Sequence, residues 1–202
     1  MYINVKNLLD KVFSLLGIIV LSPLLILVAI AIKLDSKGPV FFKQERLGLN
    51  GKVFKLYKFR SMCVGAEEKG VYETKGDMRV TRVGRFIRKT SIDEFPQFIN
   101  ILKGEMSMIG PRPTLTYHPW PLEDYTEKQK KRFEVRPGVT GWAQINGRKG
   151  LPWNERIKYD VEYSTSCSLY FDCRIFLKTV AKVVFMKDNI NTGETVQKKY
   201  NK

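Results

Sequence analysis

The chain has 202 residues and a net charge of +15, from 35 Lys and Arg against 20 Asp and Glu. This excess indicates an anionic partner: nucleic acid, acidic lipid headgroups or a phosphorylated substrate. Cys63, Cys167 and Cys173 lack metal-ligand spacing, which argues against a disulfide scaffold or zinc site and fits a reducing compartment. With His118 as the single histidine, acid–base chemistry is expected from carboxylates.

An uncharged stretch of 21 residues lies between Lys11 and Lys33 and is long enough to form a membrane helix. Ser22-Pro23 sits at its centre, where proline removes a backbone hydrogen bond and kinks or breaks a helix. Two geometries follow: a span of roughly 31 Å, or a hairpin that returns to the cytoplasmic face. Lysines flank both ends, so the positive-inside rule gives no direction. A signal peptide would have a shorter apolar region.

The chain length suits one membrane element, residues 1–37, and one compact domain, residues 38–202. After the apolar stretch, Asn50-Gly51 separates two apolar-aromatic runs and predicts a β-hairpin. Residues 64–78 are polar and contain glycine, which indicates a surface loop. The run 168–187 has apolar residues near helical spacing and lysines elsewhere, so it predicts an amphipathic helix for a core or a membrane interface.

Four arginines, Arg79, Arg82, Arg85 and Arg88, recur at every third position and would stack on one helical face. They indicate either phosphate binding or a solvated basic surface. A voltage-sensor helix also carries arginine at this spacing, but it requires an apolar membrane-length helix within a multi-span bundle. This sequence supplies a single apolar segment elsewhere.

An acidic pair, Asp93-Glu94, follows the arginines closely. Either Ser91, which would form a capping box with Glu94, or Asp93 could cap a helix that carries Pro96 near its start. Both carboxylates would then lie at a helix N-terminus, where nearby cations and helix-end amides favour their charged forms. The pair could serve as helix caps and nothing more, or as acidic groups of a site.

Three arginines lie beside residues that restrict the backbone: Arg112 between two prolines, Arg136 before Pro-Gly, and Arg148 after Asn-Gly. Solvated charges rarely require such bracing. Ligands of an oxyanion do, because preorganised donors need less reorganisation when they bind. The three turns therefore favour a phosphate site over a solvated basic surface.

Three stretches closely resemble the bacterial sugar transferases: KFRSM at 58–62, TRVGRFIRKTSIDEFPQFINILKGEMSMIGPRP at 81–113, and RPGVTGWAQINGR at 136–148. These proteins are monotopic phosphoglycosyl transferases that begin lipid-linked glycan assembly. The resemblance covers nearly the whole chain, including YDVEYS and SLYFD near its end. Phe95 is a departure, since leucine is usual there, but the carboxylates are unaffected. Longer relatives carry extra spanning helices and a further domain, so the resemblance implies the small form.

The resemblance implies an α+β, predominantly helical monotopic membrane protein with a small β-hairpin and amphipathic interface helices. Ser22-Pro23 would break the N-terminal helix into a re-entrant helix-break-helix. The enzyme would transfer a phosphosugar from a UDP-sugar to undecaprenyl phosphate or another polyprenyl phosphate and release UMP, as the first membrane step of glycan biosynthesis. Asp93 would be the nucleophile that forms a covalent phosphosugar intermediate, and Glu94 would help to bind Mg²⁺.

By the same resemblance, Arg88 and Arg112 would hold phosphate or the polyprenol headgroup, and Lys58, Arg148 and Asp160 would border the active site. The protein would lie on the cytoplasmic face of the bacterial inner membrane, in contact with anionic lipids and without a nucleic-acid partner. The residues make this chemistry coherent, because a carboxylate that attacks an anionic diphosphate needs a divalent metal and several cations to offset repulsion.

Two alternatives from other classes remain. A non-catalytic basic membrane-peripheral adaptor would use Asp93 and Glu94 only as caps and would keep its function with Asp93→Asn. A membrane-anchored nucleic-acid-binding protein would show steeply salt-dependent affinity for RNA or DNA. Neither alternative explains braced arginine turns beside an acidic pair.

Overall fold

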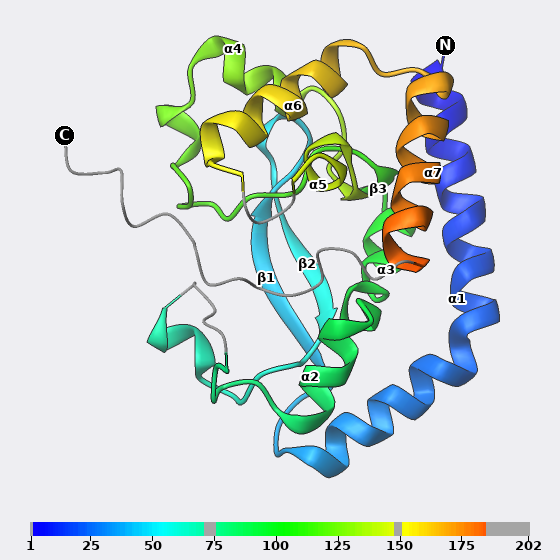
Figure 1. Cartoon of the computed structure of the whole chain (residues 1–202), viewed down its shortest axis with the longest axis vertical. Coiled ribbons are helices and arrows are strands. Elements are labelled where there is room, and N and C mark those ends of the chain that lie inside the picture. The colour runs from blue at the N-terminus through cyan, green and yellow to red at the C-terminus, as the bar shows by residue number, and fades with distance from the viewer. Residues whose placement is uncertain (1, 71–75, 148–150, 185–202) are drawn as a thin grey trace.

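The computed structural model describes residues 2–70, 76–147 and 151–184, and this part of the chain is mostly helical with two small sheets (Figure 1). The α+β, predominantly helical class is therefore confirmed. The helices are α1 (Tyr2–Asp35), α2 (Arg82–Lys89), α3 (Gln97–Leu102), α4 (Glu127–Lys130), α5 (Trp142–Ile145), α6 (Trp153–Thr165) and α7 (Leu169–Val184). The strands are β1 (Phe41–Leu47), β2 (Val53–Phe59), β3 (Ser107–Ile109) and β4 (Gly138–Thr140).

Helix α1 contains the apolar stretch and continues through Pro23 as one element that bends along its length (Figure 1). The Ser22 hydroxyl donates a hydrogen bond of 2.8 Å to the carbonyl of Ile19, one turn earlier. In the described part of the chain, α1 is the single helix long and apolar enough to cross a membrane. The Ser-Pro pair therefore lies inside a continuous helix, and no interruption of the helix separates two halves.

Strands β1 and β2 form the hairpin predicted from Asn50-Gly51, paired from Phe41 with Phe59 to Leu47 with Val53. Asn50 and Gly51 have φ angles of 54° and 73°. Asn and Gly tolerate this left-handed region, which explains why this dipeptide turns the chain. The hairpin runs through the middle of the molecule and brings the end of β2 close to α2 (Figure 1).

The C-terminal half of α1 belongs to the hydrophobic core. Val28 and Ile32 pack with Phe59, Ile87 and Ile92 in one buried cluster. This cluster joins α1, β2 and α2 to the turn that follows α2. The apolar residues of α1 that face outward remain exposed; among them are Leu8, Val12, Phe13, Leu16, Ile19, Val20, Ile26, Leu27 and Ile30.

Helix α7 confirms the predicted amphipathic helix as far as Val184; residues 185–187 of the predicted run lie outside the described residues. Ile175 and Phe171 face the core against Trp142. Phe176 and Leu177 are 57% and 67% exposed. Helix α7 lies beside α1 (Figure 1), so the two helices expose apolar side chains on neighbouring elements.

A buried polar cluster ties the N-terminal half of α1 to the rest of the protein. The Lys6 Nζ lies 2.8 Å from Asp172 Oδ2 and 3.6 Å from Asp10 Oδ2. The Ser107 hydroxyl donates to Asp10 at 2.5 Å, and the Tyr163 hydroxyl donates to Asp172 at 2.7 Å. Buried charges require such partners, because desolvation of an unpaired ion is costly. The cluster therefore fixes α1 to α6, α7 and β3.

We expect Lys6→Met to destabilise the protein by roughly 3–5 kcal/mol, because it leaves two buried carboxylates without their cation. Denaturant unfolding in detergent micelles measures the change. Lys11→Met removes an exposed lysine from the same helix and serves as the matched control. Equal stability of the two variants would show that the cluster contributes nothing to the free energy of unfolding.

Candidate active site

The acidic pair lies in a single 3₁₀ turn, Ile92–Glu94, between α2 and α3. Ser91 precedes it with φ 59°, an uncommon left-handed conformation for a residue other than glycine. Ile92 is buried and anchors the turn, while Asp93 is 9% exposed. The residues following α2 thus reverse the chain and leave the Asp93 carboxyl beneath the surface.

The prediction that Ser91 or Asp93 caps a helix is wrong. Neither side chain makes a capping hydrogen bond, and α3 begins at Gln97, after Pro96. The left-handed Ser91 places Asp93 and Glu94 in a turn of their own, ahead of the helix. The carboxylates are therefore available for contacts with other elements.

Glu94 accepts two cations on the same oxygen. Lys58 Nζ lies 2.8 Å from Glu94 Oε1, and Arg112 Nη2 lies 3.0 Å from it. Lys58 comes from β2 and Arg112 from the Gly110–Pro113 turn, so three separate elements meet at one carboxylate. The Arg112 side chain is 45% exposed, which leaves part of its guanidinium open to an incoming anion.

The two carboxyl groups have opposite pKa shifts. Burial raises the pKa of Asp93, and the neighbouring Glu94 charge adds to this, although Lys58, Arg88 and Arg112 oppose it. Burial also acts to raise the pKa of Glu94, but Lys58 and Arg112 outweigh it and hold that pKa well below its usual range. Glu94 is thus a permanent anion that neutralises cations, and Asp93 is a buried carboxyl with no ion pair of its own among the described residues.

The row of arginines is only partly helical. Arg82, Arg85 and Arg88 lie in α2, but Arg79 precedes the helix and binds Asp77 at 2.6 Å. The prediction of four arginines on one helical face is therefore wrong for Arg79. Arg88 donates to the Ser61 hydroxyl at 3.2 Å, and its charge acts on Asp93.

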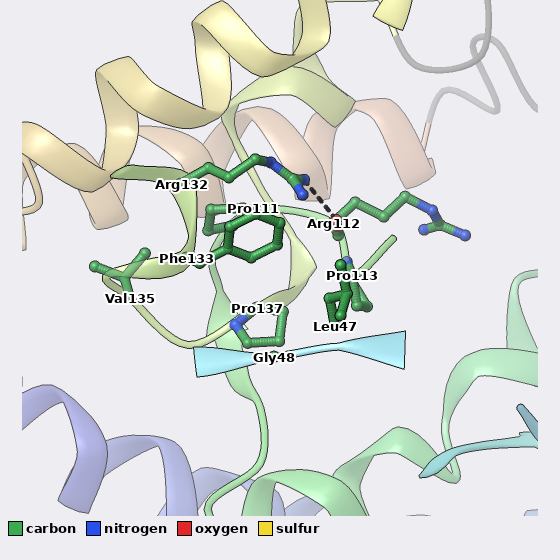
Figure 2. Close-up of a pocket in the computed structure, with 9 residues that line it drawn as sticks. All are labelled: Leu47, Gly48, Pro111, Arg112, Pro113, Arg132, Phe133, Val135 and Pro137. Atoms are coloured by element: carbon green, nitrogen blue, oxygen red, sulfur yellow. Dashed lines mark hydrogen bonds between the residues drawn. The ribbon is translucent and has the colours of Figure 1, made fainter. Parts of the chain in front are cut away.

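The Gly110–Pro113 turn encloses little space on its inner side (Figure 2). The cavity there, lined in part by Pro111, Pro113 and Phe133, has a volume of about 10 Å³. That is room for about one water molecule, so it cannot hold a substrate. The Arg112 side chain points away from this cavity (Figure 2), toward the side on which Glu94 binds it. The side of the turn that can contact a substrate is therefore the side that faces Asp93 and Glu94.

The other predicted site residues have different positions. Arg136 belongs to the segment that pairs with the Arg112 turn: Ser107 N donates to Pro137 O at 2.8 Å, and Gly138 N donates to Pro111 O at 2.9 Å. Arg148 lies outside the described residues. Asp160 is buried in α6 with its Oδ2 on Arg132 at 2.7 Å, so the described contacts place it behind the Arg112 turn. Burial raises its pKa against the opposing effect of Arg132.

Arg132 was not predicted from the sequence. It lies in the basic run Lys128–Arg132 and carries no local signal that separates it from the lysines around it. Its side chain is 2% exposed, whereas a solvated charge in such a run would be open to water. The Asp160 partner is distant in sequence, so only the fold identifies the pair.

The carboxylates can contribute to a metal site but cannot form one alone. Among the described residues, no group of three His, Cys, Asp or Glu side chains could hold a metal ion. Mg²⁺ at phosphate-transfer sites commonly takes one or two carboxylates and fills its shell with substrate phosphate oxygens and water. Asp93 and Glu94 match that donor set, so the site suits a metal that arrives with a diphosphate.

Comparison with known proteins identifies the family of the chain. The model of one family, described as bacterial sugar transferase, matches residues 1–186. The chain belongs to the bacterial sugar transferase family. The matched range contains the acidic pair and all three elements that meet at Glu94.

Several relatives in this family carry activity names. The chain is 45% identical over 179 residues to a UDP-glucose:undecaprenyl-phosphate glucose-1-phosphate transferase of Escherichia coli, covering 86% of this chain and 39% of the relative. It is 42% identical over 187 residues to a UDP-N-acetylgalactosamine-undecaprenyl-phosphate N-acetylgalactosaminephosphotransferase of Aeromonas hydrophila, covering 91% and 44%. An uncharacterized sugar transferase of Bacillus subtilis is 41% identical over 195 residues, covering 96% and 95%.

The chain spans about two fifths of the length of the first two relatives. Their names differ in the sugar, glucose in one and N-acetylgalactosamine in the other. The similarity therefore supports a common type of reaction among the relatives and does not select a sugar for this chain.

Proposed function

We propose that this protein transfers a sugar 1-phosphate from a UDP-sugar to undecaprenyl phosphate and releases UMP. The observation that carries the proposal is the arrangement around Asp93: a buried carboxyl beside Glu94, with Lys58 and Arg112 on that glutamate and Arg88 nearby. Cations gathered around a carboxyl nucleophile are what attack on a diphosphate requires, because they offset the repulsion between anions. The relatives' names support the same reaction type.

In the first step, an Asp93 carboxylate oxygen attacks the phosphorus that carries the sugar. The bond from that phosphorus to the bridging oxygen breaks, and UMP leaves with the electron pair. In the second step, a phosphate oxygen of undecaprenyl phosphate attacks the same phosphorus and releases the Asp93 carboxylate. The product is an undecaprenyl diphosphate sugar. Throughout both steps, the side chains of Lys58 and Arg112 offset part of the negative charge on the reacting phosphate groups.

Each charged residue has a defined part in this mechanism. Glu94 keeps Lys58 and Arg112 at one point, which preorganises them before the diphosphate arrives. The exposed part of Arg112 binds a diphosphate oxygen. Glu94 would help to hold Mg²⁺, and the ion would supply Lewis-acid stabilisation of the leaving oxygen.

The membrane topology follows from the two substrates. A cytosolic nucleotide sugar must meet a lipid phosphate at Asp93, so both ends of α1 belong on the cytoplasmic side. A bend in α1 (Figure 1), the helix that contains Pro23, lets the helix enter the leaflet and return, and the exposed apolar residues of α1 then face lipid. Chemical labelling from outside the cell tests this: access to a cysteine placed within residues 3–10 would contradict it.

A panel of UDP-sugars, assayed for UMP release in the presence of undecaprenyl phosphate, tests the function and identifies the sugar. We expect one UDP-sugar to support turnover that requires both lipid and a divalent metal. Hexosamines and their deoxy relatives, glucose and galactose belong in the panel. A cooperative thermal unfolding transition shows that the protein is folded. If such protein releases no UMP with any member of the panel, the proposal is contradicted.

A further inference from the structure

We infer that Arg132 is a positioning residue, held by Asp160, that fixes the Gly110–Pro113 turn so that the Arg112 guanidinium stays on Glu94. The consequence for function rests on the proposed reaction, but the positioning itself can be tested without turnover. The inference starts from contacts behind the turn, on the side away from the acidic pair.

Arg132 and Asp160 form the most deeply buried ion pair among the described residues, with side chains 2% and 3% exposed. Arg132 contacts Asp160 Oδ2 twice, from Nε at 3.1 Å and from Nη2 at 2.7 Å. Asp160 thereby fixes the plane of the guanidinium. A planar guanidinium held along one edge has little freedom to turn its remaining donors elsewhere.

Those remaining donors go to the turn that carries Arg112. Nη2 of Arg132 also donates to the Arg112 carbonyl at 2.9 Å, and Nη1 donates to the Thr114 hydroxyl at 3.4 Å. Figure 2 shows the first of these bonds and shows the Arg112 side chain leaving its backbone in the opposite direction. The carbonyl of Arg112 is therefore held from behind while its side chain reaches forward to Glu94.

The prolines on either side make this hold effective. Pro111 and Pro113 each fix their own φ angle, and Pro113 also restricts the backbone of Arg112 before it, so the main chain on both sides of the held carbonyl has little freedom to move. Arg46 Nη1 donates to the Pro113 carbonyl at 3.1 Å and secures the following peptide. A chain of contacts thus runs from Asp160 through Arg132 and the Arg112 backbone to Glu94.

Stability alone does not account for a buried pair at this place. Well-packed apolar residues often replace a buried ion pair without loss, because desolvation offsets the attraction. Asp160 Oδ1 is buried and has no hydrogen-bond partner in the described part of the chain, so the pair is not optimised for stability. What the pair adds is a directed hydrogen bond. An apolar side chain could fill the same space but could not hold the Arg112 carbonyl.

The double variant Arg132→Met/Asp160→Leu removes the pair without leaving either charge buried alone. Protein labelled with ¹⁵N-arginine in detergent micelles reports the Arg112 Nε–Hε signal, assigned by its loss in Arg112→Lys. We expect this signal to be sharp and slowly exchanging in the natural protein. In the double variant it should broaden or exchange at least about tenfold faster. An unchanged signal would overturn the inference, whatever the activity of the protein.

Kinetics provide the second readout. Removal of the pair should lower kcat about 10- to 100-fold in the natural background, the range seen when outer-shell partners are lost. In an Arg112→Ala background it should cost less than about threefold, because the residue being positioned is gone. Equal losses in both backgrounds would mean that the pair acts through general stability and would overturn the inference. Glu155→Ala/Lys158→Ala, which removes an exposed pair from the same helix, is the control and should change neither readout.

Discussion

Asp93→Asn is expected to abolish turnover, with UMP release reduced by roughly 10³-fold or more, because an amide cannot replace a carboxylate nucleophile. In the natural protein, incubation with the accepted UDP-sugar and Mg²⁺, without lipid acceptor, should release UMP and add the mass of a phosphosugar to Asp93. Peptide mass spectrometry after an acid quench measures the adduct. The same treatment of Asp93→Asn should add no mass.

The stability of Asp93→Asn separates lost chemistry from lost folding. Since burial raises the pKa of Asp93, the folded protein binds its proton more tightly than the unfolded chain does. Stability therefore falls as pH rises from the usual Asp value through the raised value. Asparagine removes that loss of stability, so the Tm at pH 7 should rise. A fall in Tm together with lost activity would make the kinetic result uninformative about the nucleophile, and an active enzyme without an adduct would indicate direct transfer between the two substrates.

Glu94→Gln is expected to reduce kcat/KM by about 10²- to 10³-fold, because it removes the common acceptor that holds Lys58 and Arg112 together. We also expect this substitution to change the pH dependence of kcat/KM. Activity requires ionised Asp93, so kcat/KM should fall as pH falls through its raised pKa. The Glu94 charge contributes to that rise, so Glu94→Gln should move this acidic limb to lower pH.

Lys58→Met provides the opposite shift and is the matched comparison. Lys58 is the cation that most strongly opposes the rise in the pKa of Asp93, so its loss should move the acidic limb to higher pH. The pH dependence of UMP release, fitted for both variants and the natural protein, checks the signs. If the acidic limbs of Glu94→Gln and Lys58→Met shift in the same direction, the assignment of this limb to Asp93 is contradicted.

Local chemistry explains which parts of the structure could be predicted from the sequence. The hairpin depends on Asn50-Gly51, whose turn preference needs no distant contact. The acidic pair and Arg112 were predicted from their types and from the restricted backbone beside the arginine, and they meet in the structure. Lys58 was predicted from the family resemblance alone, and the fold brings it to Glu94 from a strand.

The features that escaped prediction depend on tertiary contacts. The left-handed Ser91 is stabilised by the fold around it, and it prevents the capping that its residue type favours. The three-residue spacing of the arginines continues to Arg79, which lies before α2 begins. Asp77 and backbone carbonyls bind Arg79 there, and the sequence spacing alone does not show this. The Arg132–Asp160 and Lys6–Asp172 pairs join residues from separate elements, and a charged residue in sequence carries no sign of its distant partner.

The polar residues of α1 have a practical consequence for preparing this protein without lipid. Ser107, which binds Asp10, opens β3, and β3 leads directly into the turn that carries Arg112. Deleting residues 1–35 would therefore strip partners from Ser107 and Asp172 and expose Phe59, Ile87 and Ile92. The segment that looks like a detachable anchor therefore contributes buried residues to the domain near both of its ends: Lys6, Asp10 and Ser14 near the start, and Val28 and Ile32 near the end. A soluble form is better sought by changing the outward apolar residues of α1 than by cutting the helix away.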